Sequence, residues 1–295
     1  MTRRILRPHV LRRRCRVRHA STGMRLGARA AWIASMLLVA AAEPAFAQAS
    51  ANRSPAEFCL LANRNLSLGA RLPRTAARVR TGGPLRIVAV GSSSTTGFGV
   101  LSSAATYPEV MRRELARLWP NTPVEIVNSG RIGSTIPGDM ARFDRDVLAY
   151  RPDLVIWQLG TNDVAWGGRA DGLKGQVVQG VRRLRAGGAD VVLMDLQYAP
   201  MVLASSQHPA MQAIIADAAR QEHVGLFSRF ALMRRSVEAG LPPRALVSWD
   251  GLHNSGDGYD CVGRALARAV QVAAEAEHGS ANGGRAVGGP TVSRR

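Results

Sequence analysis

The chain has 295 residues, with 39 basic and 21 acidic side chains and a hydrophobic content of 46%. This length and apolar content fit one or two globular domains and exclude a disordered or collagen-like chain. The net charge of +18 is uneven, because ten basic residues and no acidic ones lie in residues 1–29. Without residues 1–47 the chain keeps 29 basic and 20 acidic residues and shows no basic cluster. The charge therefore does not indicate a nucleic-acid partner.

The first 47 residues have the three parts of an export signal. A positively charged flank precedes an apolar stretch at 30–42, and a small-x-small triplet follows at 45–47. A stretch of roughly 13 residues is shorter than the roughly 20 needed to span a bilayer. We expect a cleaved signal peptide at 1–47 and a periplasmic or secreted protein without stable membrane insertion. An uncleaved anchor is the alternative, and either Met1 or Met24 is the start of translation.

The cysteines predict one disulfide bond. Removal of the signal leaves Cys59 and Cys261, and an even number of cysteines in an oxidising compartment favours pairing. The bond would close a loop of roughly 200 residues and tie the segment 48–83 to the C-terminal helix. Two unpaired buried thiols are the alternative.

Short apolar runs alternate with helix-like stretches between residues 84 and 277. The predicted strands are 86–91, 124–128, 153–160, 189–196 and 224–228. The predicted helices are 107–118, 138–150, 173–186, 209–222, 230–239 and 256–275. Near-continuous apolar strands separated by helices are typical of a parallel sheet covered on both faces. The segment 48–83 is expected to be an N-terminal arm, and residues 278–295 a disordered tail.

Polar residues gather where three of the predicted strands end. They occupy 91–97 after the first strand, 128–133 after the second and 160–163 after the third. Asp250 and His253 stand just before the last helix. Ligands of such sheets bind beyond the carboxyl ends of the strands, so we expect these four segments to meet there.

This combination resembles the SGNH, or GDSL-type, hydrolase superfamily. That family has Gly-Asp-Ser-Leu, a glycine loop, Gly-x-Asn-Asp and Asp-x-x-His in this order, and the four segments follow the same order. The resemblance implies an α/β fold, a three-layer α/β/α sandwich with a five-stranded parallel flavodoxin-like sheet. The first motif departs from the family, because Ser92 and Ser94 replace its Asp and Leu. The family's usual aspartate contacts behind the nucleophile are therefore missing from the pattern, while the nucleophile remains.

The resemblance implies a catalytic triad. Ser93 aligns with the nucleophile, His253 with the general base, and Asp250 with the carboxylate that orients the imidazole. Of the four histidines after the signal, His253 has Asp250 three residues earlier, a spacing that lets the carboxylate reach the ring. A polar turn without a special serine, and a helix cap at Asp250, are the alternatives.

The resemblance also implies three donors for an oxyanion hole. They are the backbone N–H groups of Ser93 and Gly133 and the side-chain amide of Asn162. Plain turn residues are the alternatives for Gly133 and Asn162. Asp163 is expected to tie its loop together rather than to do chemistry.

Other reaction classes lack their residues in this sequence. It has no Gly-x-Ser-x-Gly elbow, no zinc motif, no phosphate-binding loop and no dinucleotide glycine pattern. We expect an exported serine esterase that hydrolyses carboxylic esters without a metal or cofactor, on short-chain acyl or O-acetylated envelope glycan substrates. A non-catalytic glycan- or lipid-binding protein on the same fold is the alternative. Trp166 and Tyr198 either line the substrate cleft or pack in the ordinary way, and acyl length, leaving group and oligomeric state stay open.

Overall fold

A computed structural model describes residues 54–64 and 67–276. The predicted signal peptide at 1–47 and the predicted tail at 278–295 lie outside the described residues. None of the helices in the described part of the chain combines the length and the apolar character needed to cross a bilayer.

Five parallel strands form one sheet in the order β2-β1-β3-β4-β5. The strands are β1 (Leu85–Gly91), β2 (Val124–Gly130), β3 (Leu154–Gln158), β4 (Asp190–Met194) and β5 (Gly225–Phe227). β3 is buried throughout and β1 everywhere except Arg86, because helices cover both faces of the sheet. The predicted α/β class and the five-stranded parallel sheet are confirmed.

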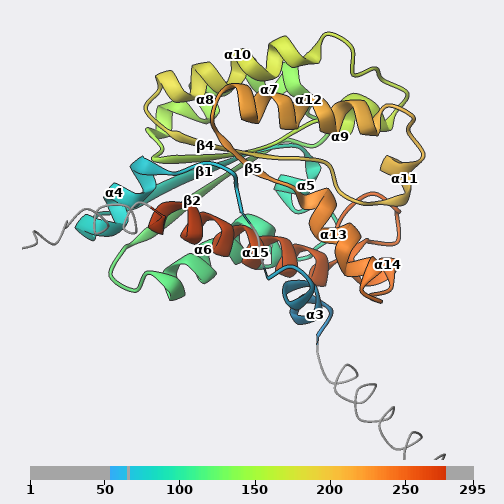
Figure 1. The fold of residues 1–295 in the computed structure, drawn as a ribbon, viewed down its shortest axis with the longest axis horizontal. Coiled ribbons are helices and arrows are strands. Elements are labelled where there is room, and N and C mark those ends of the chain that lie inside the picture. Colours follow the sequence, from blue (N-terminus) through green and yellow to red (C-terminus); the bar gives the residue numbers. More distant parts are fainter. Residues whose placement is uncertain (1–53, 65–66, 277–295) are drawn as a thin grey trace, which may run out of the picture. The chain divides into compact units, whose positions relative to one another are not determined.

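Two layers of helices enclose the sheet (Figure 1). One layer holds α3 (Pro55–Ala62), α6 (Tyr107–Leu118) and α15 (Gly256–Glu275). The other holds α7 (Ile136–Met140), α8 (Phe143–Asp146), α10 (Leu173–Ala186) and α12 (His208–Gln221). α6 and α15 approach closely at Gly263, where an added Cβ would lie 2.6 Å from the Cβ of Val110.

Short helices occupy the connections at the ends of the strands. They are α5 (Ser93–Thr96) after β1, α9 (Thr161–Ala165) after β3, α11 (Pro200–Leu203) after β4, and α13 (Arg229–Glu238) and α14 (Pro243–Leu246) after β5. Two 3-10 turns, Ser103–Ala105 and Leu148–Tyr150, complete the chain between α5 and β3.

The predicted helix at 138–150 is broken in the structure. α7 ends at Met140, α8 begins at Phe143, and a 3-10 turn follows. Arg142 lies at the break with a non-helical backbone, and its side chain is only 5% exposed. Its guanidinium turns inward and donates to the carbonyl oxygens of Ser129 (2.7 Å) and Gly91 (3.1 Å). These buried hydrogen bonds outweigh the local preference for one continuous helix.

The described part of the predicted arm forms α3 and α4 (Pro73–Thr81) and packs against the rest of the chain. α4 is fixed to the sheet by the N–H of Thr75, which donates to a carboxylate oxygen of Asp190 (2.8 Å). Arg78 also donates to the carboxylate of Asp153 (2.9 Å). The sequence analysis predicted no helix in this segment, so α3 and α4 are additions to it.

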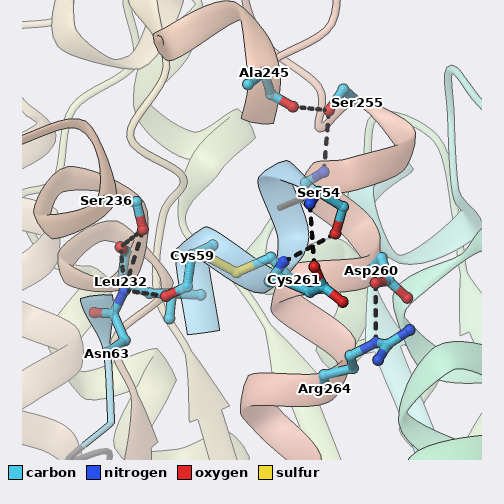
Figure 2. The surroundings of a disulfide bond; sticks show 12 residues. Ser54, Cys59, Asn63, Leu232, Ser236, Ala245, Ser255, Asp260, Cys261 and Arg264 are labelled. Atoms are coloured by element: carbon cyan, nitrogen blue, oxygen red, sulfur yellow. Dashed lines mark hydrogen bonds and ion pairs between the residues drawn. A yellow bond between two sulfur atoms is a disulfide. The ribbon is translucent and has the colours of Figure 1, made fainter. Parts of the chain in front are cut away.

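Cys59 of α3 and Cys261 of α15 form a disulfide, as predicted (Figure 2). Both residues are buried and their Cα atoms lie 6.0 Å apart. Beside the bond, the amide of Asn63 donates to Cys59 O (2.9 Å), Leu232 O (3.1 Å) and Ser236 Oγ (3.1 Å). α3 is therefore held covalently to α15 and by hydrogen bonds to α13.

A buried carboxyl group joins β4 to α13. Asp195 follows β4 and is 5% exposed. Its carboxylate accepts hydrogen bonds from the Phe230 N–H (3.0 Å) and the Ser228 hydroxyl (2.7 Å). Burial raises the pKa of Asp195 to about 6, although these bonds and the nearby Arg229 act in the opposite direction.

Removal of the disulfide is expected to destabilise the fold by about 2–5 kcal/mol. The two cysteines are 202 residues apart, so the bond strongly restricts the unfolded chain. Urea unfolding of a Cys59→Ala, Cys261→Ala double variant measures the loss. As a control, dithiothreitol should lower the midpoint of the wild type and leave that of the variant unchanged. Equal midpoints for the oxidised wild type and the double variant would contradict the expectation.

Asp195 is expected to make stability decrease as pH rises from 4 to 6. The pKa is about 6 in the folded protein and 3.8 without the fold, so the native state binds more protons in this window. The free energy of unfolding should fall by an amount on the order of 3 kcal/mol across it and then level off. Denaturant titrations at several pH values should show that Asp195→Asn removes this part of the slope. If the free energy of unfolding of the wild type and of Asp195→Asn changes equally with pH, this expectation is wrong.

Candidate active site

A sharp turn after β1 presents Ser93 at the carboxyl edge of the sheet. At Gly91 the backbone lies so close to β3 that an added Cβ would be 2.6 Å from the carbonyl oxygen of Gln158. Ser93 is the first residue of α5, so its N–H has no partner within the helix. The Ser93 side chain lies at a protected site, with only 6% of the residue exposed.

The side chains of Ser93, His253 and Asp250 are hydrogen-bonded in line. His253 Nε2 lies 2.8 Å from Ser93 Oγ, although the two residues are 160 positions apart. On its other side, His253 Nδ1 lies 2.5 Å from Asp250 Oδ2. This geometry lets an imidazole take a proton from a hydroxyl while a carboxylate fixes the ring and its tautomer.

Asp250 is fixed by its own turn. Its Oδ1 accepts hydrogen bonds from the N–H groups of Leu252 and His253, both at 3.0 Å. Burial alone would raise the pKa of Asp250, but the hydrogen bonds from the His253 ring and from these two N–H groups lower it below its usual value. Asp250 is therefore ionised at neutral pH and can stabilise an imidazolium.

An aromatic ring covers the imidazole. The centroids of the Phe98 and His253 rings lie 4.4 Å apart. The Tyr259 hydroxyl donates to the carbonyl oxygen of Phe98 (3.0 Å), which ties this residue to α15. His253 is thus confined between the Asp250 turn and the Phe98 ring, and it is 8% exposed.

The loop of Gly133 is tied to helix α9, which carries Asn162. The Asn162 side-chain amide donates one hydrogen bond to the carbonyl oxygen of Ser134 (2.8 Å), and its second hydrogen has no described partner. Gly133 has φ +76° and open space beside its Cα. Asp163 accepts a hydrogen bond from the Ile136 N–H (3.1 Å), which ties α9 to α7.

A buried ion pair between Asp139 and Arg142 is hydrogen-bonded to Ser134, the residue after Gly133. Asp139 accepts hydrogen bonds from Arg142 (2.7 Å), the Trp157 indole (3.0 Å) and the Ser134 hydroxyl. Burial raises the pKa of Asp139, and these hydrogen bonds oppose the shift. The sequence gives only a weak signal for this pair, since an aspartate and an arginine three positions apart suit any exposed helix.

Gln158 occupies the space behind the serine turn. Its Oε1 accepts hydrogen bonds from the Ser92 N–H (3.0 Å), the Ser92 hydroxyl (2.9 Å) and the Thr95 hydroxyl (3.2 Å). Gln158 therefore holds the turn whose sequence lacks the aspartate of the GDSL pattern. Sequence reasoning missed this residue, and its one signal is a polar side chain in an otherwise apolar strand.

Gln197 joins the histidine loop to α9. It is fully buried, and its Nε2 donates to the carbonyl oxygen of Leu252 (3.0 Å). Its Oε1 accepts hydrogen bonds from the Thr161 hydroxyl (2.9 Å) and from the buried Arg229 (2.7 Å). Sequence reasoning missed Gln197 too, because only the fold brings these three elements together.

Trp166 and Tyr198 have different environments. Trp166 follows α9 and is 65% exposed. The Tyr198 ring packs edge-on against Phe230, with the centroids 5.2 Å apart. The ring of Tyr198 thus has a packing partner, the indole of Trp166 is largely exposed, and a place in the substrate cleft stays a prediction for both residues.

Solved structures similar to this chain include three hydrolases. A two-domain esterase active on acetylated mannans, co-crystallized with mannopentaose, matches with a TM-score of 0.61 and 20% identity, over 70% of this chain and 54% of that chain. An acetylxylan esterase from Geobacillus stearothermophilus matches with a TM-score of 0.52 and 22% identity, over 63% and 94%. An alpha/beta hydrolase enzyme from the metagenome of Lake Arreo, Spain, matches with a TM-score of 0.54 and 19% identity, over 63% and 95%. This chain thus spans about half of the two-domain esterase, and at these identities the likeness establishes the fold.

No curated protein matches the chain at a significant level. The model of the Non-GDSL lipase-like family matches residues 58–276. Its description agrees with Ser92 and Ser94, which stand where a GDSL motif has Asp and Leu. The chain belongs to the Non-GDSL lipase-like family, in broad agreement with the predicted resemblance to SGNH-type hydrolases.

Proposed function

We propose that this protein is an exported serine hydrolase that cleaves carboxylic esters through an acyl-enzyme. The observation that carries the proposal is the unbroken line of hydrogen bonds from Ser93 Oγ through the His253 ring to Asp250. A polar turn or a helix cap does not require such a line, whereas nucleophilic catalysis does.

The reaction has two halves. In the first, His253 Nε2 takes the proton of Ser93 while Oγ bonds to the ester carbonyl carbon, and the carbonyl oxygen becomes an oxyanion. The intermediate then collapses, the bond to the alcohol oxygen breaks, and His253 returns the proton to the leaving alcohol. In the second half His253 takes a proton from water, whose oxygen bonds to the acyl carbon. The bond from that carbon to Ser93 Oγ then breaks, His253 returns the proton to Oγ, and the acid is released. Asp250 stays ionised and stabilises the imidazolium in both halves.

Three donors would hold the oxyanion. The N–H groups of Ser93 and Gly133 donate to no other group in the described part of the chain. The Asn162 amide keeps one hydrogen available after its bond to Ser134. Donors fixed in advance stabilise developing charge without reorganisation at the moment of reaction.

We propose that the substrates are short-chain acyl esters or O-acetylated envelope glycans. The proposed reaction needs no metal or cofactor. Two similar structures are esterases described as active on acetylated mannans or as acetylxylan esterases, which supports an acetyl ester. The signal-like residues 1–47 and the Cys59–Cys261 disulfide support a periplasmic or secreted location. The mature chain would then begin at Gln48, with the hydrolase domain at 84–277.

A fluorophosphonate probe is expected to label Ser93 and no other serine. Ser93→Ala should abolish labelling and lower turnover of p-nitrophenyl acetate at least 1,000-fold, and His253→Ala should strongly reduce both. Peptide mass spectrometry of the labelled protein identifies the site. Ser94→Ala is the matched control, because Ser94 is adjacent but makes no hydrogen bond to the imidazole. Labelling that survives Ser93→Ala, or glycan binding without any ester cleavage, would overturn the proposal.

Loss of the Asn162 amide is expected to lower kcat about 100- to 1,000-fold. Asn162→Ala removes one oxyanion donor, and Asn162→Asp should be at least as damaging because it places a negative charge beside the oxyanion. Steady-state kinetics with p-nitrophenyl acetate measures kcat and KM separately, and KM should change much less. Since the amide also ties the Gly133 loop through Ser134, thermal unfolding checks that each variant is folded. A folded Asn162→Ala enzyme within tenfold of the wild-type kcat would rule out this role.

A further inference from the structure

A cleft of about 390 Å³ lies between the loops that follow α9 and α11. One wall is the end of α9 with the loop that follows it, and the other is α11 with the loop that follows it. The Met201 N–H of the second wall donates to the carbonyl oxygen of Gly251 (3.0 Å), in the turn that carries Asp250 and His253. The first wall belongs to the helix that carries Asn162. One wall is therefore hydrogen-bonded to the turn that carries His253, and the other wall continues the helix that carries Asn162.

The lining of this cleft is polar. Gln207 Oε1 accepts a hydrogen bond from the Ala170 N–H (3.2 Å), which ties the two walls and leaves the Gln207 NH2 group available. Ser206 is exposed, and its hydroxyl bonds to no other described group. Arg169 is exposed and paired with Asp171 at the surface. Ligand pockets are usually lined mainly by apolar side chains, so these donors and hydroxyls suit a polyhydroxylated ligand better than an acyl chain.

The position of the cleft favours the alcohol half of an ester. His253 protonates the leaving alcohol, so the alcohol must lie on the imidazole side of the Ser93 hydroxyl. Met201, which lines the cleft, is hydrogen-bonded to Gly251 in the turn that carries His253. Trp166, 65% exposed, lies between two residues that line the cleft and offers a flat apolar face to a sugar ring.

We propose that this cleft binds the sugar half of an O-acetylated glycan. Arg169, Ser206 and Gln207 hydrogen-bond to the sugar hydroxyls, and Trp166 contacts the ring at the edge of the cleft. Its volume lies at the low end of the roughly 300–1,000 Å³ typical of ligand pockets, which suits a short stretch of glycan. This inference rests on the proposed serine esterase function.

Two variants test the cleft. Ser206→Phe fills it, and Arg169→Ala removes a donor. For each, kcat/KM is measured on acetylated mannooligosaccharides and xylooligosaccharides and on p-nitrophenyl acetate, whose alcohol is not a sugar. We expect the ratio of glycan to p-nitrophenyl activity to fall at least tenfold, mainly through a higher KM for the glycan. Arg145→Ala is the matched control, since Arg145 is similarly exposed (72%) and pairs with its neighbour Asp146; its ratio should equal that of the wild type.

Other outcomes overturn the inference. An equal loss on both substrates would mean that the variants damage the catalytic geometry rather than a sugar site. A selective loss on p-nitrophenyl octanoate with Ser206→Phe would assign the cleft to the acyl chain. If neither ester cleavage nor probe labelling occurs, the proposed function fails separately, and calorimetric titration of deacetylated mannooligosaccharide then tests the cleft alone. Binding that Ser206→Phe weakens at least tenfold supports the sugar site, and the absence of binding overturns it.

Discussion

Parallel pairing around β1 is the constraint on which the site depends. β1 lies between β2 and β3, with Gly91 opposite Gly130 and Val90 opposite Trp157. Because the three strands run in one direction, their carboxyl ends reach the same edge of the sheet, whatever their separation along the chain. The serine turn, the glycine loop and the Asn162 helix must therefore emerge side by side. The turn that carries His253 does not directly follow one of these three strands, so other contacts must hold it beside them.

Two buried side-chain amides and one buried ion pair provide these contacts and hold the loops of the candidate site in place. Gln158 holds the serine turn, Gln197 holds the histidine turn against α9, and the Asp139–Arg142 pair holds the glycine loop. Each group is buried, so a lost partner would leave an unsatisfied polar atom at a cost of about 1–3 kcal/mol. Such networks favour one loop arrangement over others, which suits a site whose reacting atoms must stay within hydrogen-bond distance.

The sequence predicts the elements better than the contacts between them. Strands and long helices follow from apolar periodicity, and α6, α10 and α15 begin and end where it places them. The prediction of one continuous helix at 138–150 is wrong because Arg142 is buried by its hydrogen bonds to strand ends that are far away in the chain. The candidate site residues could be named because four motifs occur in a known order. Gln158 and Gln197 could not be named from the sequence, because their hydrogen-bond partners are backbone and side-chain groups that come near them only in the folded chain.

The disulfide closes most of the described chain into one covalent ring. α3 is its first helix and α15 its last, so all five strands and every loop of the candidate site lie between the two bonded sulfur atoms. Fraying from either end, the usual first step of local opening, stops at Cys59 and at Cys261, while the helical residues outside this pair are still able to unwind. Opening of the chain between the two cysteines has to begin in an internal loop, so we expect a protease to cut first in the exposed turns around the candidate site.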